Sequence, residues 1–436
     1  MINKHSFITN SLLTSLLLIS LLSSCDYAGS KLFEKHPHKL YTQKLEKSGL
    51  IHSAMGRQWV AAAGRSLNAP VGIKLPYVAE GYFAAETPDA YAIAFEARQG
   101  EKITVNVALR AQDNAELFAD LWKLENGAKE LLEFSDSTGH AITYEVEETG
   151  TYAVRLQPEL LQSVSYKLTI SNGPSLAFPI KEGHKANIGS LWGVDRDGGA
   201  RRHEGIDIFA PLRTPLVAAD DGEITRVNEN RLGGKVVWLR PKGRSYVLYY
   251  AHLDSQIAQP GQLVKRGDVI GLVGNTGNAR TTPPHLHFGV YTSGGAVDPL
   301  PFVNPKVRKP DTIQADVSML GEEMRLVTTI KPLDNNEAAV EKWTLVRLIA
   351  ATANGYHVLL PDGTKDFVSA KSLSTTDAPI KKLNAKGAIA LLDAPDEQSA
   401  VKRITTEPVN MLAAFNNYYY ISDGTVKGWV HSSHFK

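Results

Sequence analysis

Cysteine is almost absent from this sequence, because Cys25 is the only one in 436 residues. A chain with one cysteine cannot form an intramolecular disulfide or build a metal site from cysteine ligands. An excess of either charge is also absent: 47 Lys and Arg stand against 46 Asp and Glu, a formal net charge of +1. Proteins that bind nucleic acid normally carry a basic face or stripe. We therefore expect no disulfide, no cysteine-based metal centre and no nucleic-acid partner.

An apolar run long enough to span a membrane is lacking at the N-terminus. Residues 7–22 are apolar but interrupted by polar residues, whereas a membrane helix needs roughly 20 predominantly apolar residues. With Lys4 before it, the run is typical of a secretory signal. It ends in Leu22-Ser23-Ser24-Cys25, which resembles a bacterial lipobox. A chance cysteine at the end of an ordinary signal peptide is the alternative.

The lipobox resemblance implies that residues 1–25 are a lipoprotein signal peptide and that Cys25 carries the lipid. Three acyl chains, which the resemblance also implies, would hold the protein stably on a membrane, since a single chain binds only marginally. We therefore expect a periplasmic lipoprotein of the cell envelope. The choice between inner and outer membrane stays open.

The length of the chain predicts two to four domains, because 436 residues are too many for one ordinary core. In residues 26–69 the spacing of Met55 and Trp59 predicts an amphipathic helix. His36-Pro37-His38 in this segment suggests a metal site, but the proline and the neighbouring Lys and Glu favour an exposed position. We interpret 26–69 as a helical tether.

Residues 70–172 alternate between short apolar–polar runs and turn residues. Examples are Tyr91 to Phe95, Thr151 to Leu156 and Tyr166 to Ile170. A period of two with Gly or Asn between the runs predicts an antiparallel β-sandwich. The layout resembles the jelly-roll modules found beside secreted bacterial peptidases. We expect an accessory or ligand-binding domain, with a plain spacer as the alternative.

Residues 178–305 carry the strongest strand signals. Runs such as Lys235 to Leu239 and Tyr246 to Ala251 are separated by turn residues such as Gly233-Gly234 and Pro260-Gly261. Helical periodicity is not convincing anywhere in this block. The pattern predicts a compact, mostly antiparallel β-domain, so the whole protein is predicted to be mainly β and multi-domain.

Candidate metal ligands and proton carriers concentrate in this central block. They are His203 and Asp207 in a His-Glu-Gly-Ile-Asp run, His252 in Tyr-Tyr-Ala-His-Leu, and His285 and His287 in Pro-His-Leu-His-Phe. His285 and His287 lie two apart on a predicted strand, so their side chains share one face. A lone histidine is more often structural, but this combination in one β-block indicates a site.

The spacing of His203 and Asp207 fits either a helix or a strand. On a helix, His203-Glu204 would resemble the zincin motif with Glu204 as the base. Gly205 weakens a helix, however, and Ile206 alternates with Asp207 as in a strand. We therefore place Asp207 on a strand, with His203 entering from the preceding turn.

These residue types suit a catalytic zinc ion, which typically takes three protein ligands and a water. One carboxylate and two imidazoles would cancel half of the metal charge and leave the water acidic enough to supply hydroxide near neutral pH. Spacing alone leaves open whether His285, His287 or both bind the metal.

Several motifs of the central block together resemble the M23 family of zinc endopeptidases, the lysostaphin and LytM-type enzymes that cut peptidoglycan peptides. They are H-E-G-I-D-I-F-A-P, T-P-L-V-A-A-D-D-G-E-I, Y-Y-A-H-L, G-Q-L-V-K-R-G-D-V-I-G-L-V-G-N-T-G and P-H-L-H-F-G-V. The resemblance implies a Zn²⁺ cofactor held by His203, Asp207 and His287. It implies that His252 and His285 are catalytic imidazoles. The departures, Leu212-Arg213 and residues 278–283, do not touch a ligand.

The C-terminal part of the chain repeats a pattern of strand, Asn turn, aromatic strand and Asp-Gly hairpin. The Asp-Gly pairs stand at Asp362 and Asp423, which predicts two small barrels at 325–376 and 384–436. They resemble bacterial SH3-like wall-binding domains. Wall targeting is the expected role, with a packing or autoinhibitory module as the alternative.

Two classes of function follow from these motifs. The first is a membrane-anchored zinc metallo-endopeptidase that hydrolyses cross-links or stem peptides in peptidoglycan. The second is a non-catalytic wall-binding lipoprotein that scaffolds or activates another hydrolase, with an envelope protein as its partner. The complete set of implied ligands favours the enzyme.

Substitution of Glu204 separates the strand from the helical interpretation of the site. We expect Glu204→Gln to keep peptidoglycan cleavage and His285→Ala to abolish it, because in the M23-like arrangement His285 carries a proton and Glu204 does not. Muropeptide release measures both. The opposite result would replace the M23-like interpretation by the zincin one.

Overall fold

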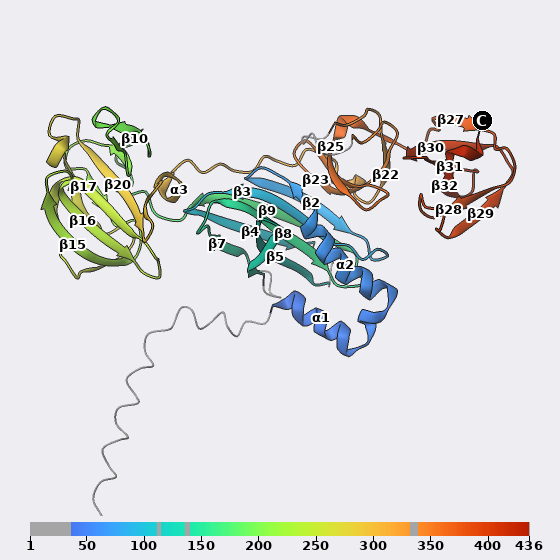
Figure 1. Ribbon diagram of the computed structural model, residues 1–436, viewed down its shortest axis with the longest axis horizontal. Helices are drawn as coiled ribbons and strands as arrows, with labels where there is room; N and C mark the ends of the chain where they lie inside the picture. Colours follow the sequence, from blue (N-terminus) through green and yellow to red (C-terminus); the bar gives the residue numbers. More distant parts are fainter. Residues whose placement is uncertain (1–35, 111–114, 136–139, 332–338, 436) are drawn as a thin grey trace, which may run out of the picture.

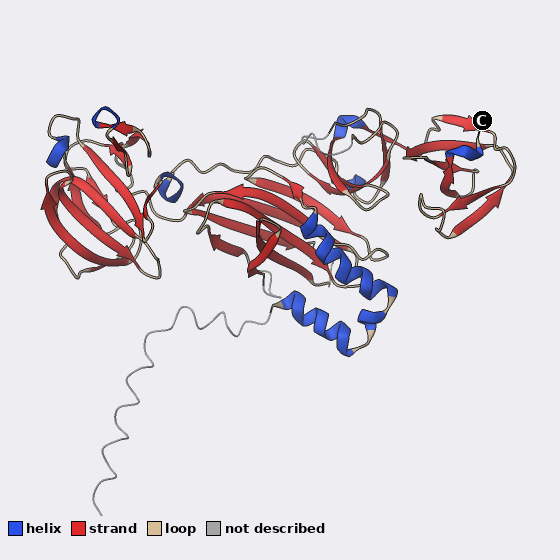
Figure 2. Ribbon diagram, in the orientation of Figure 1, coloured by secondary structure: helices blue, strands red, loops and turns tan. Residues whose placement is uncertain are grey.

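The computed structural model describes residues 36–110, 115–135, 140–331 and 339–435 (Figure 1). Cys25, the predicted lipidation site, lies outside these residues. The described chain is built mainly from β-strands in several sheets, which confirms the predicted fold class, and its longer helices gather on one side of the central sandwich (Figure 2). Within the described residues, none of the helices combines the length and the apolarity needed to cross a membrane.

Two sheets form the sandwich. One has the order β1-β3-β8-β5-β6 and the other contains β2-β9-β4-β7. The strands are β1 (Val71–Gly72), β2 (Tyr77–Phe83), β3 (Tyr91–Ala97), β4 (Glu101–Leu109), β5 (Leu117–Glu125), β6 (Ala128–Phe134), β7 (Ile142–Glu145), β8 (Gly150–Pro158) and β9 (Val164–Pro174). Alternate residues of β9, such as Leu168 and Ile170, are fully buried between the sheets, as the period of two requires.

The helices α1 (Pro37–Lys47) and α2 (Ala54–Asn68) pack on this sandwich. Ser53 caps α2 by accepting a hydrogen bond from the Gly56 amide. Trp59, 1% exposed, packs against Leu45 and Phe118 of β5, and its indole N–H donates to the Pro158 carbonyl. Burial of the indole holds the helix pair on the sheet.

The prediction that His36-Pro37-His38 lies in an exposed tether is wrong. His38 is 9% exposed, stacks on Trp59 with ring centroids 4.7 Å apart, and hydrogen-bonds through Nε2 to Gln157 Oε1 at 2.6 Å. His36 Nε2 lies 2.7 Å from Asp120 Oδ1. The apolar side chains of the two helices pack against the outer face of the sandwich. Both histidines therefore lie in this contact and not in solvent.

The central sheet has the order β10-β13-β20-β17-β16-β15-β18 and is antiparallel, as predicted for this block. Its strands and the short β14, β19 and β21 that pair with it are β10 (Asn187–Ser190), β13 (Ile206–Phe209), β14 (Pro215–Val217), β15 (Gly222–Asn230), β16 (Gly234–Pro241), β17 (Val247–Gln256), β18 (Leu263–Val264), β19 (Val269–Val273), β20 (His285–Thr292) and β21 (Gly295–Val297). A hairpin of β11 (Asp195–Arg196) and β12 (Arg201–Arg202) precedes β13.

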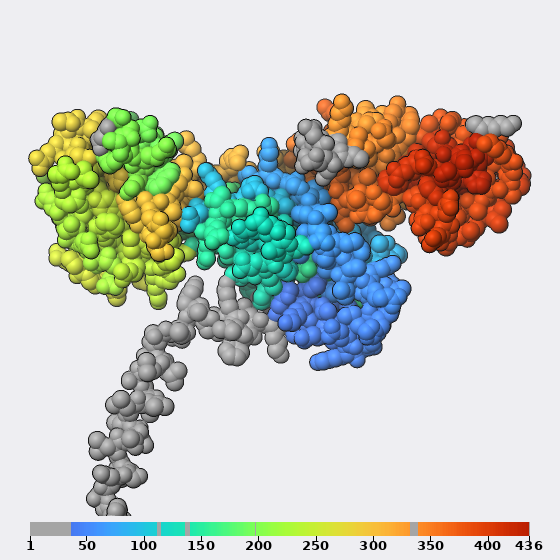
Figure 3. Space-filling view, in the orientation of Figure 1, coloured from blue at the N-terminus to red at the C-terminus, as the bar shows by residue number. Residues whose placement is uncertain are grey.

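The sandwich connects the central sheet to the C-terminal part of the chain. The short helix α3 (Leu300–Val303) contacts β9, and Arg244 forms an ion pair with Glu145 of β7. On the other side, β23 (Leu345–Ala351) pairs with β2, so one sheet runs from the sandwich into the next unit. The space-filling view shows the two parts at opposite ends of the sandwich (Figure 3).

Two groups of short strands follow, and the division into two barrels stays a prediction. The first contains β22 (Glu323–Leu326), β23, β24 (Gly355–Leu359), β25 (Lys365–Ser369) and β26 (Leu373–Thr375). The second contains β27 (Lys381–Leu383), β28 (Ile389–Leu392), β29 (Val401–Thr405), β30 (Val409–Phe415), β31 (Tyr418–Ser422) and β32 (Lys427–His431). Arg325 joins them by donating to the carbonyls of Ala378 and Leu412. Their likeness to SH3 domains stays a prediction.

Acid should loosen the contact between the helix pair and the sandwich. Burial, and then the positive charge of Arg155, lower the pKa of His38 from 6.5 to about 4. When the helix pair leaves the sandwich, His38 regains its ordinary pKa. Between pH 6.5 and about 4 the detached state therefore binds one more proton than the packed state, so the free energy of packing becomes less favourable as pH falls. We expect about 2 kcal/mol of lost protection at pH 4.5 relative to pH 7, measured by hydrogen exchange of α1 amides.

His38→Gln should flatten this pH dependence, because the amide does not titrate. His52→Gln is the matched control, since His52 is exposed on the same helical segment, and it should keep the parental slope. Equal acid sensitivity of the parent and His38→Gln would contradict the assignment.

Candidate active site

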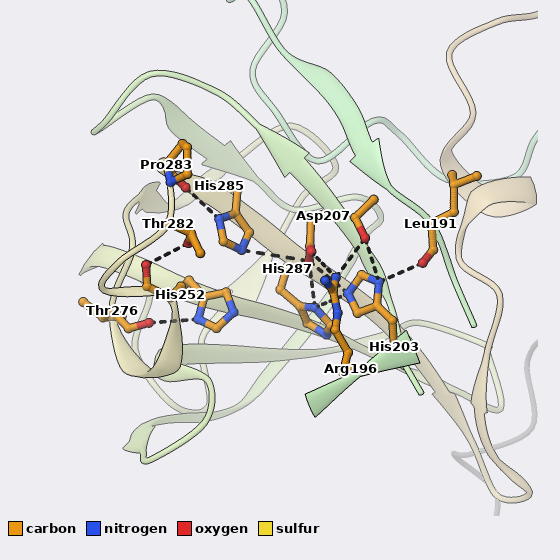
Figure 4. Close-up of polar contacts among 12 residues, drawn as sticks. Leu191, Arg196, His203, Asp207, His252, Thr276, Thr282, Pro283, His285 and His287 are labelled. Atoms are coloured by element: carbon orange, nitrogen blue, oxygen red, sulfur yellow. Dashed lines mark hydrogen bonds and ion pairs between the residues drawn. The ribbon is translucent and has the colours of Figure 1, made fainter. Parts of the chain in front are cut away.

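The five site residues predicted from the sequence meet on one face of the central sheet (Figure 4). Asp207 on β13 lies directly opposite His287 on β20, and Ala251 of β17 is the next partner of His287. His252 follows Ala251, and His285 shares the face of His287. Residues 203–205 are not helical, so Asp207 is borne by a strand, as expected, and His203 enters from the preceding loop.

His203, Asp207 and His287 form a group that could hold a metal ion. His203 Nε2 lies 3.0 Å from both Asp207 Oδ1 and His287 Nδ1, and His287 Nδ1 lies 3.1 Å from the same oxygen. Ligands about 2.0–2.1 Å from a tetrahedral zinc ion are about 3.3 Å apart. Two nitrogens and one oxygen at this spacing fit zinc.

Hydrogen bonds orient the ligand atoms of this group. His203 Nδ1 is 2.8 Å from the Leu191 carbonyl, to which it must donate, so Nε2 is the ring nitrogen that faces Asp207 and is left to bind a metal. Burial raises the pKa of Asp207, but the neighbouring rings of His203 and His287 outweigh it and hold that pKa well below its ordinary value. Burial lowers the pKa of His287. Asp207 is therefore a carboxylate and His287 a neutral imidazole, the forms that bind metal.

His252 and His285 form a second pair beside this group. Their ring centroids are 5.0 Å apart, and His285 Nε2 is 4.0 Å from Asp207 Oδ1. Each Nδ1 lies 2.9 Å from a carbonyl, of Thr276 and of Pro283 respectively. Because carbonyls only accept, Nδ1 carries the proton in both rings and Nε2 is free to accept another.

Burial, and then the neighbouring His285 and His287, lower the pKa of His252 to about 4. The ring is therefore neutral at neutral pH and can act as a base. Its backbone is in the left-handed region, with φ of 64°, which is uncommon for a residue other than glycine. The His252 amide donates to the Gly233 carbonyl at 2.7 Å, which helps to hold this conformation. Such local strain is concentrated at functional sites.

The site opens into a groove of about 510 Å³. One wall is aromatic: Trp238, Tyr249 and Tyr291 lie with ring centroids between 4.4 and 5.9 Å apart, and Tyr249 continues toward His287 at 6.0 Å. Glu204, predicted to be a bystander, also lines the groove.

Sequence reasoning missed Arg196, which donates to Asp207 Oδ2 at 2.6 Å. The sequence did offer a signal for it. Three arginines stand just before the His-Glu-Gly-Ile-Asp run: Arg196, Arg201 and Arg202. The aromatic wall was missed as well, because its members come from three strands and share no local pattern.

Comparison with known proteins identifies the central block. The profile described as "Peptidase family M23" matches residues 201–299. The chain therefore contains an M23 peptidase domain.

Similar proteins carry endopeptidase names. The L-Ala--D-Glu endopeptidase of Bacillus subtilis is 37% identical over 137 residues, which are 29% of this chain and 42% of that protein. The peptidoglycan DD-endopeptidase ShyC of Vibrio cholerae is 37% identical over 97 residues, 22% of each protein. The catalytic domain of lysostaphin from Staphylococcus simulans is a structural match at 31% identity, covering 27% of this chain and 91% of that one with a TM-score of 0.25. The chain spans less than half the length of these two curated relatives.

Gly205→Ala should damage the ligand group without a change of charge. A Cβ at this position would lie 2.7 Å from the His287 ring and 2.6 Å from the Phe288 carbonyl oxygen, so His287 must move. We expect zinc affinity to fall at least about tenfold, as when metal ligands lose their orientation. Competition with a chromogenic chelator measures it.

Gly294→Ala is the control for this substitution. Its Cβ would meet only the Thr292 hydroxyl at 3.6 Å, so parental zinc affinity is expected. Parental affinity in Gly205→Ala would show that His287 is not constrained as described.

Proposed function

We propose that this protein is a membrane-anchored zinc metallo-endopeptidase that hydrolyses peptide bonds in peptidoglycan, in cross-links or stem peptides. The observation that carries the proposal is the pairing of the His203, Asp207 and His287 group with the two adjacent imidazoles of His252 and His285. Other imidazole and carboxylate groups can be structural, but this one opens into a groove large enough for a peptide.

His203 Nε2, Asp207 Oδ1 and His287 would hold the zinc ion. When bound, zinc supplies Lewis acidity, which polarises a carbonyl group and makes water a stronger acid. Asp207 contributes the one negative charge of the group, and its burial limits competition from water.

His252 and His285 would handle the protons of the hydrolysis. The unprotonated Nε2 of one ring accepts the proton of the attacking water, and the other ring, once Nε2 also carries a proton, stabilises the oxyanion or protonates the leaving amine. The carbonyls of Thr276 and Pro283 hold the proton on Nδ1 of both rings, so that Nε2 is the atom that gains or loses a proton. The low pKa of His252 keeps it neutral at physiological pH.

The substrate class rests on the names of the relatives and on the neighbouring domains. One relative is named a peptidoglycan DD-endopeptidase and another an L-Ala--D-Glu endopeptidase. A lipid at Cys25 would place the chain on an envelope membrane facing the wall, and the two C-terminal β units would bind the wall. A periplasmic location follows from the same motif.

The decisive experiment measures zinc and muropeptide release together. We expect the detergent-solubilised full chain to bind one zinc ion and to release muropeptides from purified sacculi, with release lost on chelation and restored by zinc. His252→Ala should keep the zinc and lose at least about a hundredfold in rate, the usual contribution of a general acid or base. Asp207→Asn should lose the zinc as well.

His184→Ala is the matched control, because His184 is an exposed histidine of the same part of the chain. It should keep both zinc and rate. If the zinc-loaded parent releases no muropeptide, the enzyme proposal fails and the non-catalytic wall-binding lipoprotein replaces it.

A further inference from the structure

Arg196 reaches the candidate metal site from the β11–β12 hairpin. The hairpin runs beside His203: the Gly193 amide donates to the His203 carbonyl and the His203 amide donates to the Val194 carbonyl, both at 2.9 Å. Figure 4 shows the guanidinium next to Asp207 and His203. The same short ribbon therefore carries Arg196 and leads into His203.

The two oxygens of the Asp207 carboxylate have different partners. Oδ1 faces His203 and His287 at 3.0 and 3.1 Å. Oδ2 accepts from Arg196 Nη2 at 2.6 Å, and the same nitrogen donates to Ser190 Oγ at 2.8 Å. Ser190 is the β10 partner of Asp207 in the strand register, so the guanidinium is anchored on the neighbouring strand.

An aspartate carboxylate that has one oxygen without a partner can rotate about its Cβ–Cγ bond, or it can offer both oxygens to a metal. A charge-assisted hydrogen bond to Oδ2 removes this freedom and leaves Oδ1 directed at the histidines. The positive charge of Arg196 also opposes a second cation nearby. Because Arg196 and the metal would use different oxygens, we expect the gain in zinc affinity from an oriented carboxylate to exceed the loss from repulsion between Arg196 and the metal.

We infer that Arg196 is a positioning residue: it holds Asp207 so that Oδ1 alone faces His203 and His287, and thereby sets the zinc affinity of the site. This inference rests on the proposed function, since it concerns the same zinc site. Arg196 acts through Asp207 and does not itself handle a reacting atom.

The test measures zinc affinity of the full chain by competition with a chromogenic chelator, in the absence of substrate. Arg196→Gln should bind zinc 10–100-fold more weakly, the usual cost of losing a partner of a metal ligand. Arg196→Lys keeps the charge but replaces the rigid, planar guanidinium by an ammonium on a flexible stem, and should recover part of the affinity. Arg202→Gln, an exposed arginine of the same hairpin, should match the parent.

A second readout separates positioning from simple loss of structure. At saturating zinc, muropeptide release by Arg196→Gln should return to within a few-fold of the parent, which a misfolded site would not allow. If Arg196→Gln does not fold, Ser190→Ala replaces it: this variant removes the second anchor of the guanidinium and should weaken zinc binding several-fold.

Three results would overturn the inference. Unchanged zinc binding in Arg196→Gln, or in both Arg196→Lys and Ser190→Ala, would mean that Arg196 has no effect on the site. Tighter zinc binding in Arg196→Gln would mean that Arg196 competes with the metal as a second cation. Unchanged affinity with a lost rate would place it on the substrate. A parent that binds no zinc and releases no muropeptide would instead refute the proposed function, so the two failures are distinguishable.

Discussion

The register between β13 and β20 is the constraint on which the site depends. It places Asp207 opposite His287 on one face, while Ile206, Ile208 and Phe288 are fully buried on the other. Burial of such side chains contributes about 1.5–3 kcal/mol each, and a shift of one residue would turn them to solvent and the ligands into the core. Core packing on one side of the sheet thus determines the position of polar groups on the other.

Close backbone packing around the second pair of imidazoles explains the glycines of the Gly-Asn-Thr-Gly run. A Cβ at Gly274 would lie 2.2 Å from the Asp254 amide nitrogen, and one at Gly277 would lie 2.3 Å from that of Gly234. Only glycine permits these approaches. They bring the Thr276 carbonyl to His252, so the backbone of a turn sets the tautomer of a candidate proton carrier.

The sandwich is the structural link between the M23 domain and the C-terminal units. Its sheet continues into β23 through the pairing of Glu80 with Ala351 and of Gly81 with Ala350. On the opposite side, Arg244 and α3 attach the M23 domain to it. Backbone hydrogen bonds across a unit boundary restrict hinge motion, so the proposed wall-binding units and the groove would keep a defined separation along this frame (Figure 1).

The sequence by itself determined the mainly β class, the M23-like block and the five candidate site residues, because alternation of apolar residues and short motifs are local properties. The spacing placed His285 and His287 on one face, but it did not show which of them is the candidate metal ligand and which the candidate proton carrier. The strand register groups His287 with His203 and Asp207 and leaves His285 4.0 Å from Asp207 Oδ1. The burial of His38, the contact of His36 with Asp120, the aromatic wall and the contact of Arg196 with Asp207 were decided only by the tertiary structure. Each of these depends on which surface a helix, strand or hairpin packs against, and that is set by contacts between residues far apart in the chain.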